Sequence, residues 1–292
     1  MKVKQKGTKR PTGPQYPPTT IKNLIIVSDS HVGCQLGLMH PDGARLDEDL
    51  IVRPSKFQLK MWAFWTEFWT VWVPEVTRGE PYAVLHNGDA IDGVHHGATN
   101  QWSHNMEDQV DHAYKILQPI ADAAEGGYYH VRGTEAHVGK SANFEEQLAK
   151  RLGARPSSEG QYARWDLWKR VGSALVHCLH HIGTTGSSAH ESSAVNAEMT
   201  AEYVEAARWG NEPPDYVVRS HRHRSIAVDL NSSKGYAAGI VTPAWQGKTP
   251  FAWKVPGARL SVPQFGGVLI RQGDEEHYYR RKVWSIERSP VE

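Results

Sequence analysis

Short apolar runs, each ending in polar residues, recur along much of the chain. The run from Asn23 to Val27 is rich in β-branched residues and too short for a helix, so it predicts a buried strand. Runs of the same kind predict strands over residues 82–86, 127–131, 162–168, 174–179 and 215–219. Residues 225–287 alternate and turn like β structure, apart from a Trp-, Pro- and Gly-rich stretch over 243–263. Since no internal repeat or clear linker interrupts the pattern, we expect one domain over residues 23–292.

Longer stretches with an apolar period of three to four residues predict helices between the strands. Over residues 55–73, apolar and aromatic side chains recur on one face, which is typical of a helix packed on a core. Pro74 is expected to end this helix. Two further helices are predicted over residues 105–124 and 143–152. The pattern Ser188-x-x-Glu191 predicts a capping box that opens a helix running to about residue 209.

Side chains of the metal-ligand type follow five of the predicted strands. Asp29 and His31 come directly after the first strand, and residues two apart in an extended segment point to the same side. The other four strand ends carry Gly88-Asp89, Gly133-Thr134-Glu135-x-His137, His180 and His221-x-His223. Because sites in α/β sheets form at the carboxyl ends of strands, we expect these side chains to converge.

The chemistry of these side chains suits a pair of metal ions. Carboxylate oxygen and imidazole nitrogen together favour borderline divalent ions, so we expect two ions, with Mn first and Fe, Zn or Ni as alternatives. A carboxylate can bridge two ions, and ions about 3.5–4 Å apart form the usual clamp for phosphoryl displacement. The 16 His residues of the chain are consistent with such a site. The pattern therefore predicts a dinuclear metal site.

Composition bears on the partners and the cellular compartment of the protein. The formal net charge of +1 implies no overall attraction to nucleic acid or to a membrane surface. The two cysteines form no disulfide framework, and with no signal peptide visible we expect a cytoplasmic protein. The most apolar stretch is too short and too polar to span a bilayer. Residues 1–22 are basic and Pro-rich, which predicts a disordered tail that is either solvated or in weak contact with a polyanion.

The order of these motifs resembles the calcineurin-like metallophosphoesterases. The family pattern is Asp-x-His, Gly-Asp, Gly-Asn-His-Asp/Glu, a lone His and Gly-His-x-His, and residues 24–31, 83–92, 128–137, 175–183 and 216–223 match it in order. The segments 28–33 and 132–137 further resemble bacteriophage-type members. The resemblance implies an α/β fold in which two mixed β-sheets form a sandwich flanked by helices, in α-β-β-α layers.

The resemblance also implies site residues. Carried over residue by residue, it assigns ligands to two metals, with Asp29, His31 and His223 on the first, Asp89 as a bridge, and His180 and His221 on the second. His181 adjoins His180 and is a rival for the same role. Arg222 is a candidate for holding substrate phosphate.

The third motif departs from the family. Thr134 stands where the ligand Asn is expected, Glu135 stands where the catalytic His is expected, and His137 appears two positions later. An ionised carboxylate is a poor acid, whereas imidazole titrates near neutrality. We therefore expect Glu135 to be a metal ligand and His137 to be the general acid. The alternative is that Glu135 points to solvent and His137 packs under the loop.

The implied reaction is metal-dependent hydrolysis of a phosphoester. A phosphodiesterase or nuclease is favoured, because the long loops 33–54 and 92–104 and the stretch 243–263 are placed to wall a groove in which bases stack. A phosphomonoesterase acting on a phosphoprotein or nucleotide is the second hypothesis. A non-catalytic scaffold with the same fold is the third, and it is disfavoured by the number of ligand-type residues retained.

Overall fold

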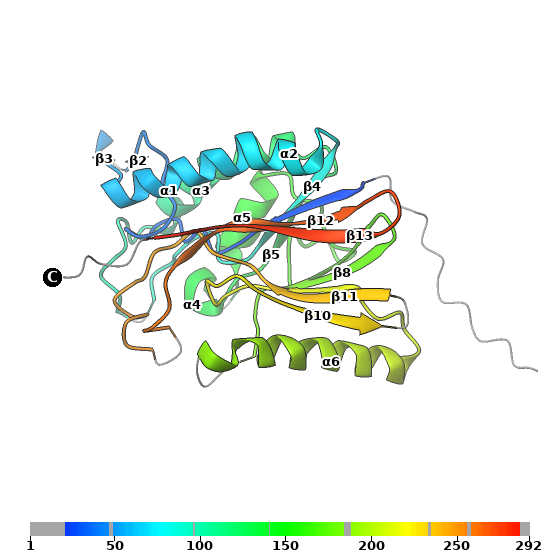
Figure 1. Cartoon of the computed structure of the whole chain (residues 1–292). Coiled ribbons are helices and arrows are strands. Elements are labelled where there is room, and N and C mark those ends of the chain that lie inside the picture. The colour runs from blue at the N-terminus through cyan, green and yellow to red at the C-terminus, as the bar shows by residue number, and fades with distance from the viewer. Residues whose placement is uncertain are drawn as a thin grey trace, which may run out of the picture.

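The computed structural model describes residues 21–46, 49–95, 97–139, 141–183, 188–232, 235–255 and 258–286. Apart from residues 21 and 22, the predicted basic tail lies outside the described residues. Within the described ranges the chain is a mixed α/β structure, in which mixed sheets are flanked by helices (Figure 1).

The first sheet contains the strand from which the sequence analysis began. Its six strands lie in the order β13 (His277–Ser285), β12 (Gln264–Gln272), β1 (Asn23–Val27), β4 (Tyr82–Asn87), β5 (Tyr128–Val131) and β6 (Ala163–Arg164). Strands β1, β4, β5 and β6 are parallel neighbours, whereas β12 is antiparallel to both β1 and β13. The carboxyl ends of β1, β4 and β5 therefore meet at one edge.

The second sheet has five strands and is also mixed. Its order is β10 (Ile226–Ser232), β11 (Gly235–Val241), β9 (Tyr216–Arg219), β8 (Ala174–Leu179) and β7 (Asp166–Val171). The strand predicted over residues 162–168 is two strands, because Trp165 separates β6 of one sheet from β7 of the other. A short hairpin of β2 (Ala44–Arg45) and β3 (Ile51–Val52) lies within the segment 33–54, which the sequence predicted to be irregular.

Alternation along β1 explains how the sheets pack. Leu24 and Ile26 belong to a buried cluster that also contains Val176 and Cys178 of β8, so these side chains lie between the two sheets. Ile25 belongs to a second cluster, formed with the helices on the other face of the first sheet. A strand buried on both faces needs a continuous apolar run, which is what residues 24–27 supply.

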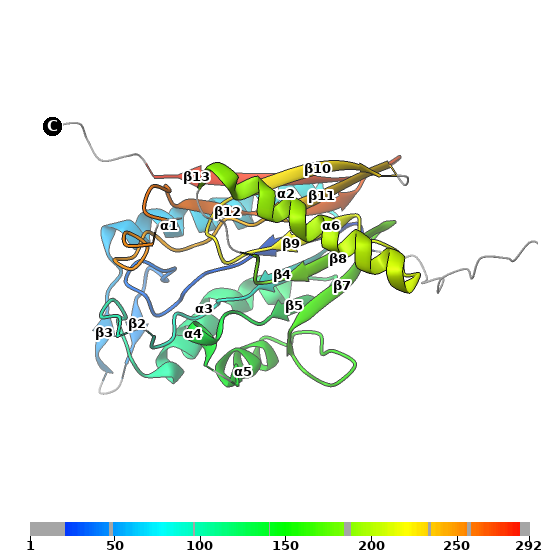
Figure 2. The same ribbon diagram turned by 90° about the horizontal axis from the view of Figure 1, so that it is seen from below.

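The helices cover the outer faces of the sheets. They are α1 (Lys56–Glu67), the π-helix η2 (Phe68–Trp72), α2 (Val73–Thr77), α3 (Met106–Ala123), α4 (Glu135–Val138), α5 (Asn143–Arg151), the 3₁₀ turn η3 (Ser188–His190) and α6 (Glu191–Trp209). Helices α1, α2, α3 and α5 lie on the side of the first sheet, and α6 lies on the side of the second (Figures 1 and 2). No helix within the described ranges combines the length and the apolar character that crossing a membrane requires.

Two sequence predictions about helix ends are wrong. Pro74 does not end the first helix, because a π-helical turn precedes it and it enters the first turn of α2, where a missing N–H costs little. The helix therefore continues to Thr77. The helix predicted to open at Ser188 begins later, because Ser188–His190 form a 3₁₀ turn, α6 begins at Glu191 and its N-cap residue is His190.

Candidate metal centre

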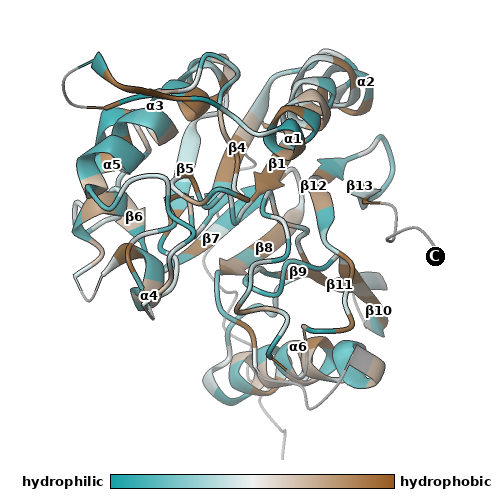
Figure 3. Cartoon of the chain, turned by 90° about the vertical axis from the view of Figure 1, so that its left-hand side faces the viewer, coloured by the Kyte–Doolittle hydropathy of each residue, from teal (hydrophilic) through white to brown (hydrophobic). Residues whose placement is uncertain are grey.

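Six of the predicted ligands converge in two clusters at the carboxyl ends of the strands. The first cluster consists of Asp29, His31 and His223, and the second of Asp89, His180 and His221. Five of these six residues lie on the loops that follow β1, β4 and β9, and His180 follows β8. Figure 3 views the molecule from the end at which these loops lie.

The first cluster has the spacing of a coordination site. His223 Nε2 lies 3.3 Å from Asp29 Oδ1 and 3.1 Å from His31 Nε2. His31 Nε2 lies 3.9 Å from the same Asp29 oxygen. Ligand atoms at about 2.0–2.2 Å from one tetrahedral ion are roughly 3.3–3.6 Å from each other. The three side chains therefore fit a divalent ion.

The second cluster is joined to the first through His180. His180 Nε2 lies 3.0 Å from Asp89 Oδ2 and 3.9 Å from Asp29 Oδ1. Its other nitrogen, Nδ1, donates to the backbone oxygen of Asn87 over 2.7 Å, which fixes the ring so that Nε2 faces the carboxylates. The ring of His221 completes the cluster, 5.4 Å from that of His180 between centroids.

Two buried atoms in these clusters lack a hydrogen-bond partner. Asp29 Oδ1 and His180 Nε2 are both inaccessible to solvent, and neither makes a hydrogen bond within the described residues. Buried polar atoms are nearly always satisfied, so orphaned atoms that face each other require an explanation. A metal ion held by each cluster would satisfy both atoms. This observation supports the fit of the donor set to a metal ion.

The backbone at the clusters is strained. Asp29, His31, Asp89, His221 and His223 all have positive φ angles, between 44° and 69°. Within the described residues only three other non-glycine residues do so. This region costs about 1–3 kcal/mol for each such residue and persists only where the surroundings enforce it, typically at functional sites. The strain thus falls on the predicted ligands.

Charge in the clusters is balanced between carboxylates and imidazoles. Burial would raise the pKa of Asp29, but the charges of His180 and His223 prevail and hold it well below its usual value. Burial would lower the pKa of His31, but the neighbouring carboxylates of Asp29 and Asp92 raise it to about 10. The ionised carboxylate of Asp29 thus lies beside a cationic His31 ring. Divalent ions can supply that positive charge in place of protons.

Asp92 supports the first cluster from behind. It is buried, and its Oδ1 accepts from His31 Nδ1 over 3.2 Å and from Gln246 Nε2 over 3.1 Å. Its Oδ2 accepts from Gln101 Nε2 over 2.7 Å. A carboxylate that receives the second ring nitrogen of a ligating histidine fixes the tautomer and orientation of that ring. Asp92 therefore orients His31.

Glycine is required beside Asp89. A Cβ atom on Gly133 would lie 2.0 Å from Asp89 Oδ1, so no side chain fits between the two loops. Gly88 has a φ of 89°, and a Cβ there would lie 2.4 Å from His180 Nδ1. The two Gly positions in the sequence motifs therefore reflect close approach of the backbone to the ligands.

The structure separates the three residues of the altered motif. Thr134 contacts Asp89 directly, because its backbone N–H donates over 2.7 Å and its hydroxyl over 3.1 Å to Asp89 Oδ1. Glu135 is exposed at the start of α4 and belongs to neither cluster, so the structure does not bring this predicted ligand to the others. His137, two residues later in α4, points back and places Nε2 4.0 Å from Asp89 Oδ2.

The other predicted residues take distinct positions. His180 is buried in the second cluster, whereas its rival His181 is exposed and outside both clusters. Arg222 lies beside the clusters at the wall of a cavity. Arg219, two residues before His221, is instead buried on β9 and pairs with Glu198 and Glu202 of α6.

A cavity of about 1060 Å³ opens over the two clusters. Its floor includes His31, Asp89 and His137, and part of its wall comes from residues 97–100. Another part of the wall comes from the segment that joins β11 to β12, within residues 246–263. Two of the three segments expected to wall a groove therefore do so. Figure 1 shows this segment at the same end of the sheets as α4.

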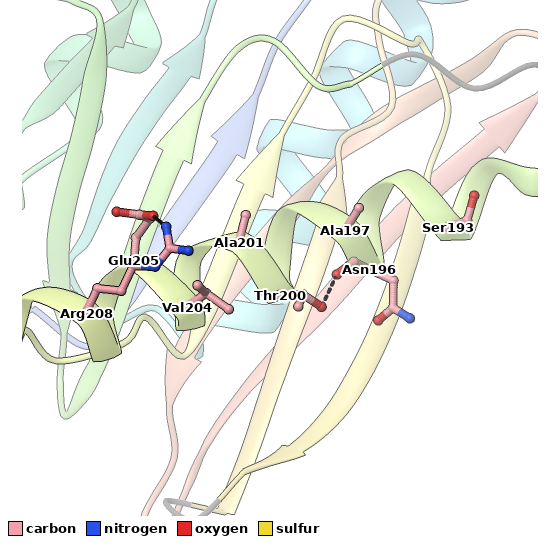
Figure 4. Close-up of a pocket in the computed structure, with 8 residues that line it drawn as sticks. All are labelled: Ser193, Asn196, Ala197, Thr200, Ala201, Val204, Glu205 and Arg208. Carbon is pink, nitrogen blue, oxygen red and sulfur yellow. Dashed lines mark hydrogen bonds and ion pairs between the residues drawn. The ribbon is translucent and has the colours of Figure 1, made fainter.

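A second, shallower cavity of about 620 Å³ lies on the outer face of α6 (Figure 4). It is lined by small and polar side chains, and an ion pair of 2.7 Å between Arg208 and Glu205 borders it. None of the residues that line it belongs to the metal clusters. We therefore place the candidate site only in the larger cavity.

Comparisons with known proteins are limited to distant structures. No protein-family model and no curated protein matches the chain. The chain is similar to Vacuolar Protein Sorting 29 from Cryptosporidium parvum, with 11% identity, a TM-score of 0.35 and 91% of this chain and 98% of that chain covered. It is similar to Thermotoga maritima protein TM1076, with 9% identity, a TM-score of 0.36, and 90% and 100% covered. It is similar to sulfate thiohydrolase SoxB from Thermus thermophilus, with 10% identity, a TM-score of 0.42, and 93% and 58% covered.

Proposed function

We propose that the chain is a two-metal phosphoesterase of the calcineurin-like type, with the sandwich architecture of that family. The observation that carries the proposal is the pair of Asp/His clusters joined through Asp29, His180 and Asp89. Two divalent ions, when bound there, would supply Lewis-acid charge to phosphoryl oxygens and lower the pKa of water. Asp29, His31 and His223 would hold one ion, and Asp89, His180 and His221 the other. Thr134 would orient Asp89 through its two hydrogen bonds.

We also propose a proton-accepting role for His137. Its Nδ1 donates to the backbone oxygen of Asp92 over 2.6 Å, so the neutral ring carries its proton there and presents Nε2 as an acceptor. Burial lowers the pKa of His137 to about 4, which keeps Nε2 unprotonated at neutral pH. The sequence alone suggested a general acid. The hydrogen bond and the burial favour an acceptor that faces the cavity.

The cavity supports a diester as the substrate. A single phosphate would occupy a small part of about 1060 Å³, and the wall offers cationic Arg222 and Lys254 together with the ring of Phe251. Cations that follow a phosphate backbone and aromatic rings that stack on bases are the features by which single-stranded nucleic acid is bound. We therefore propose that a phosphodiester with an aromatic or nucleoside group on its second ester oxygen is preferred to a monoester.

Removal of metal should abolish hydrolysis. Treatment with a chelator, followed by dialysis, is expected to reduce turnover of a nitrophenyl phosphodiester to background, and added Mn²⁺ should restore it, because the Asp/His clusters lack any other source of Lewis-acid charge. Turnover is measured together with bound metal by atomic emission. Unchanged turnover in a preparation shown to be metal-free would refute the two-metal proposal.

A diester should be turned over more efficiently than a monoester. We expect kcat/KM for thymidine 5′-(p-nitrophenyl phosphate) to exceed that for p-nitrophenyl phosphate. Phe251→Ala should lower kcat/KM for the nucleoside diester at least about fivefold, since stacking on a base is worth about 1–3 kcal/mol. Leu260→Ala is the matched control, because Leu260 is exposed on the same segment but does not line the cavity. Preference for the monoester by the wild type would instead favour a phosphomonoesterase.

A further inference from the structure

A buried carboxylate lies directly behind the second cluster. Glu145 is on α5, and its exposed fraction is 0%. Its Oε1 accepts from the backbone N–H of Ala90 over 2.9 Å, and its Oε2 accepts from the backbone N–H of Gly133 over 2.7 Å. The two oxygens of one side chain thus hold the backbones of two different loops. Figure 2 shows α5 near α4 and β5.

Both of these loops carry residues of the candidate site. Ala90 directly follows Asp89, and Gly133 directly precedes Thr134, which donates twice to Asp89. The second loop continues into α4 and His137. Because Glu145 binds on both sides of this contact, it fixes the distance between the Asp89 loop and the loop of His137.

The surroundings of Glu145 connect it with the first loop of the site as well. His130 Nε2 lies 3.6 Å from Glu145 Oε1, and the ring of His130 stacks on that of His86 with centroids 5.1 Å apart. His86 Nε2 and Ser30 Oγ share a hydrogen bond of 2.5 Å, and Ser30 lies between Asp29 and His31. A buried polar layer therefore runs beneath three ligand loops.

The cost of burying this carboxylate suggests a specific purpose. Within the described residues no Lys or Arg pairs with Glu145, and its partners are backbone N–H groups and one imidazole. Taking a carboxylate out of water costs several kcal/mol, and packing alone would be served as well by an apolar side chain. An apolar side chain could not make the two charge-assisted hydrogen bonds by which Glu145 holds the backbones of the two loops.

We infer that Glu145 is a positioning residue that sets the spacing of the Asp89 loop and the His137 loop, and thereby the affinity of the second cluster for a divalent ion. The inference rests on the proposed two-metal function. Glu145 touches neither substrate nor metal in this role. It acts through the backbone on either side of the ligands, as hydrogen-bond partners behind metal ligands do in other sites.

The neighbouring residue provides a matched control. Glu146 is on the same helix, and its carboxylate also accepts from two backbone N–H groups, those of Tyr162 over 2.9 Å and Ala163 over 2.7 Å. Those groups lead into β6, away from the clusters, and Glu146 contacts the loop of Gly133 through a partly exposed ion pair of 3.8 Å with Arg132. If Glu145→Gln acted only by loosening the attachment of α5, Glu146→Gln should therefore have the same effect.

The test compares Mn²⁺ binding by the full chain with Glu145→Gln and Glu146→Gln variants, using calorimetric titration and manganese EPR. We expect Glu145→Gln to weaken the binding of one of the two ions about 10–100-fold. This is the range observed when a hydrogen-bond partner of a metal ligand is lost. Glu146→Gln should bind both ions like the wild type. In the metal-free protein, amide exchange of Ala90 or Gly133 should accelerate in Glu145→Gln only, because Gln retains one acceptor oxygen for two donors.

The possible outcomes separate the two proposals. Failure of the wild type to bind Mn²⁺ overturns the two-metal function and this inference with it. Normal binding by a folded Glu145→Gln overturns the inference alone. If Glu145→Gln does not fold, Glu145→Asp keeps the charge with a shorter reach and should bind one ion more weakly. Failure of both variants to fold would show a role in folding rather than in spacing, and would overturn the inference.

Discussion

Replacing Asp89 by asparagine should eliminate nearly all phosphoesterase activity. Asp89 lies 3.0 Å from His180 Nε2, receives two hydrogen bonds from Thr134 and faces Nε2 of His137. Its loss would remove one carboxylate charge from the cluster that would hold the second ion. We expect kcat/KM to fall by more than roughly 100-fold, which is the upper end of the loss when a hydrogen-bond partner of a metal ligand is removed. Bound metal, measured by atomic emission, should fall from two ions to one.

Asp92→Asn is the matched comparison, because Asp92 is equally buried but acts on His31 from behind. Asparagine retains one acceptor oxygen, so we expect a loss of about 10–100-fold in kcat/KM. Metal occupancy should be restored at high Mn²⁺ concentration, because mass action compensates for weakened affinity. Equal losses in the two variants would argue against direct metal contact by Asp89.

His137→Ala should reduce turnover by a similar factor for good and poor leaving groups. A proton acceptor acts on the attacking water, and the need for that step does not depend on how easily the alkoxide departs. Positioned acid–base catalysis contributes about 10²–10⁴-fold, so we expect a loss of kcat within that range. The measurement compares a nitrophenyl diester with an alkyl diester of the same nucleoside.

The same experiment tests the role that the sequence first suggested. If His137 protonates the leaving group, its loss should be small for nitrophenolate, which needs little protonation, and large for an alkoxide. His137→Gln serves as a control for space filling in the cavity. Retention of both metal ions in His137→Ala would separate proton transfer from metal ligation, since loss of an ion would make His137 a ligand.

The apolar pattern determined much of what could be predicted. A strand buried on both faces, such as residues 24–27, needs an unbroken apolar run, and the polar residue that ends the run then marks the sheet edge. Asp29 and Asp89 were found in this way. Gly88 and Gly133 are also visible in the sequence motifs. The structure shows that a Cβ atom at Gly88 would collide with His180, and one at Gly133 with Asp89.

Residues that are far from the ligands in the sequence but contact their loops in the fold could not be recognised from the apolar pattern. Glu145 appears in the sequence as one of several charged residues of an amphipathic helix, and only the tertiary structure brings it behind Asp89. Residues 135–138 form a single helical turn, too short to show a period. That turn directs His137 inward and leaves Glu135 exposed, which spacing alone does not reveal.

Several expectations stay predictions. These are the bacteriophage-type resemblance, the single domain over residues 23–292, the cytoplasmic location, the nucleic-acid substrate, the identity of the metal and the assigned role of each site residue. The basic tail over residues 1–22 lies largely outside the described residues.

The positive φ angles at five of the six clustered residues have an evolutionary consequence. At each of these positions glycine would relieve the backbone strain, so drift without selection on the chemistry should replace Asp or His by Gly. A lineage that kept only the fold would thus gain stability as it lost its ligands. We therefore expect relatives that keep the proposed activity to keep Asp or His at these five positions, and relatives that have lost it to carry Gly at some of them.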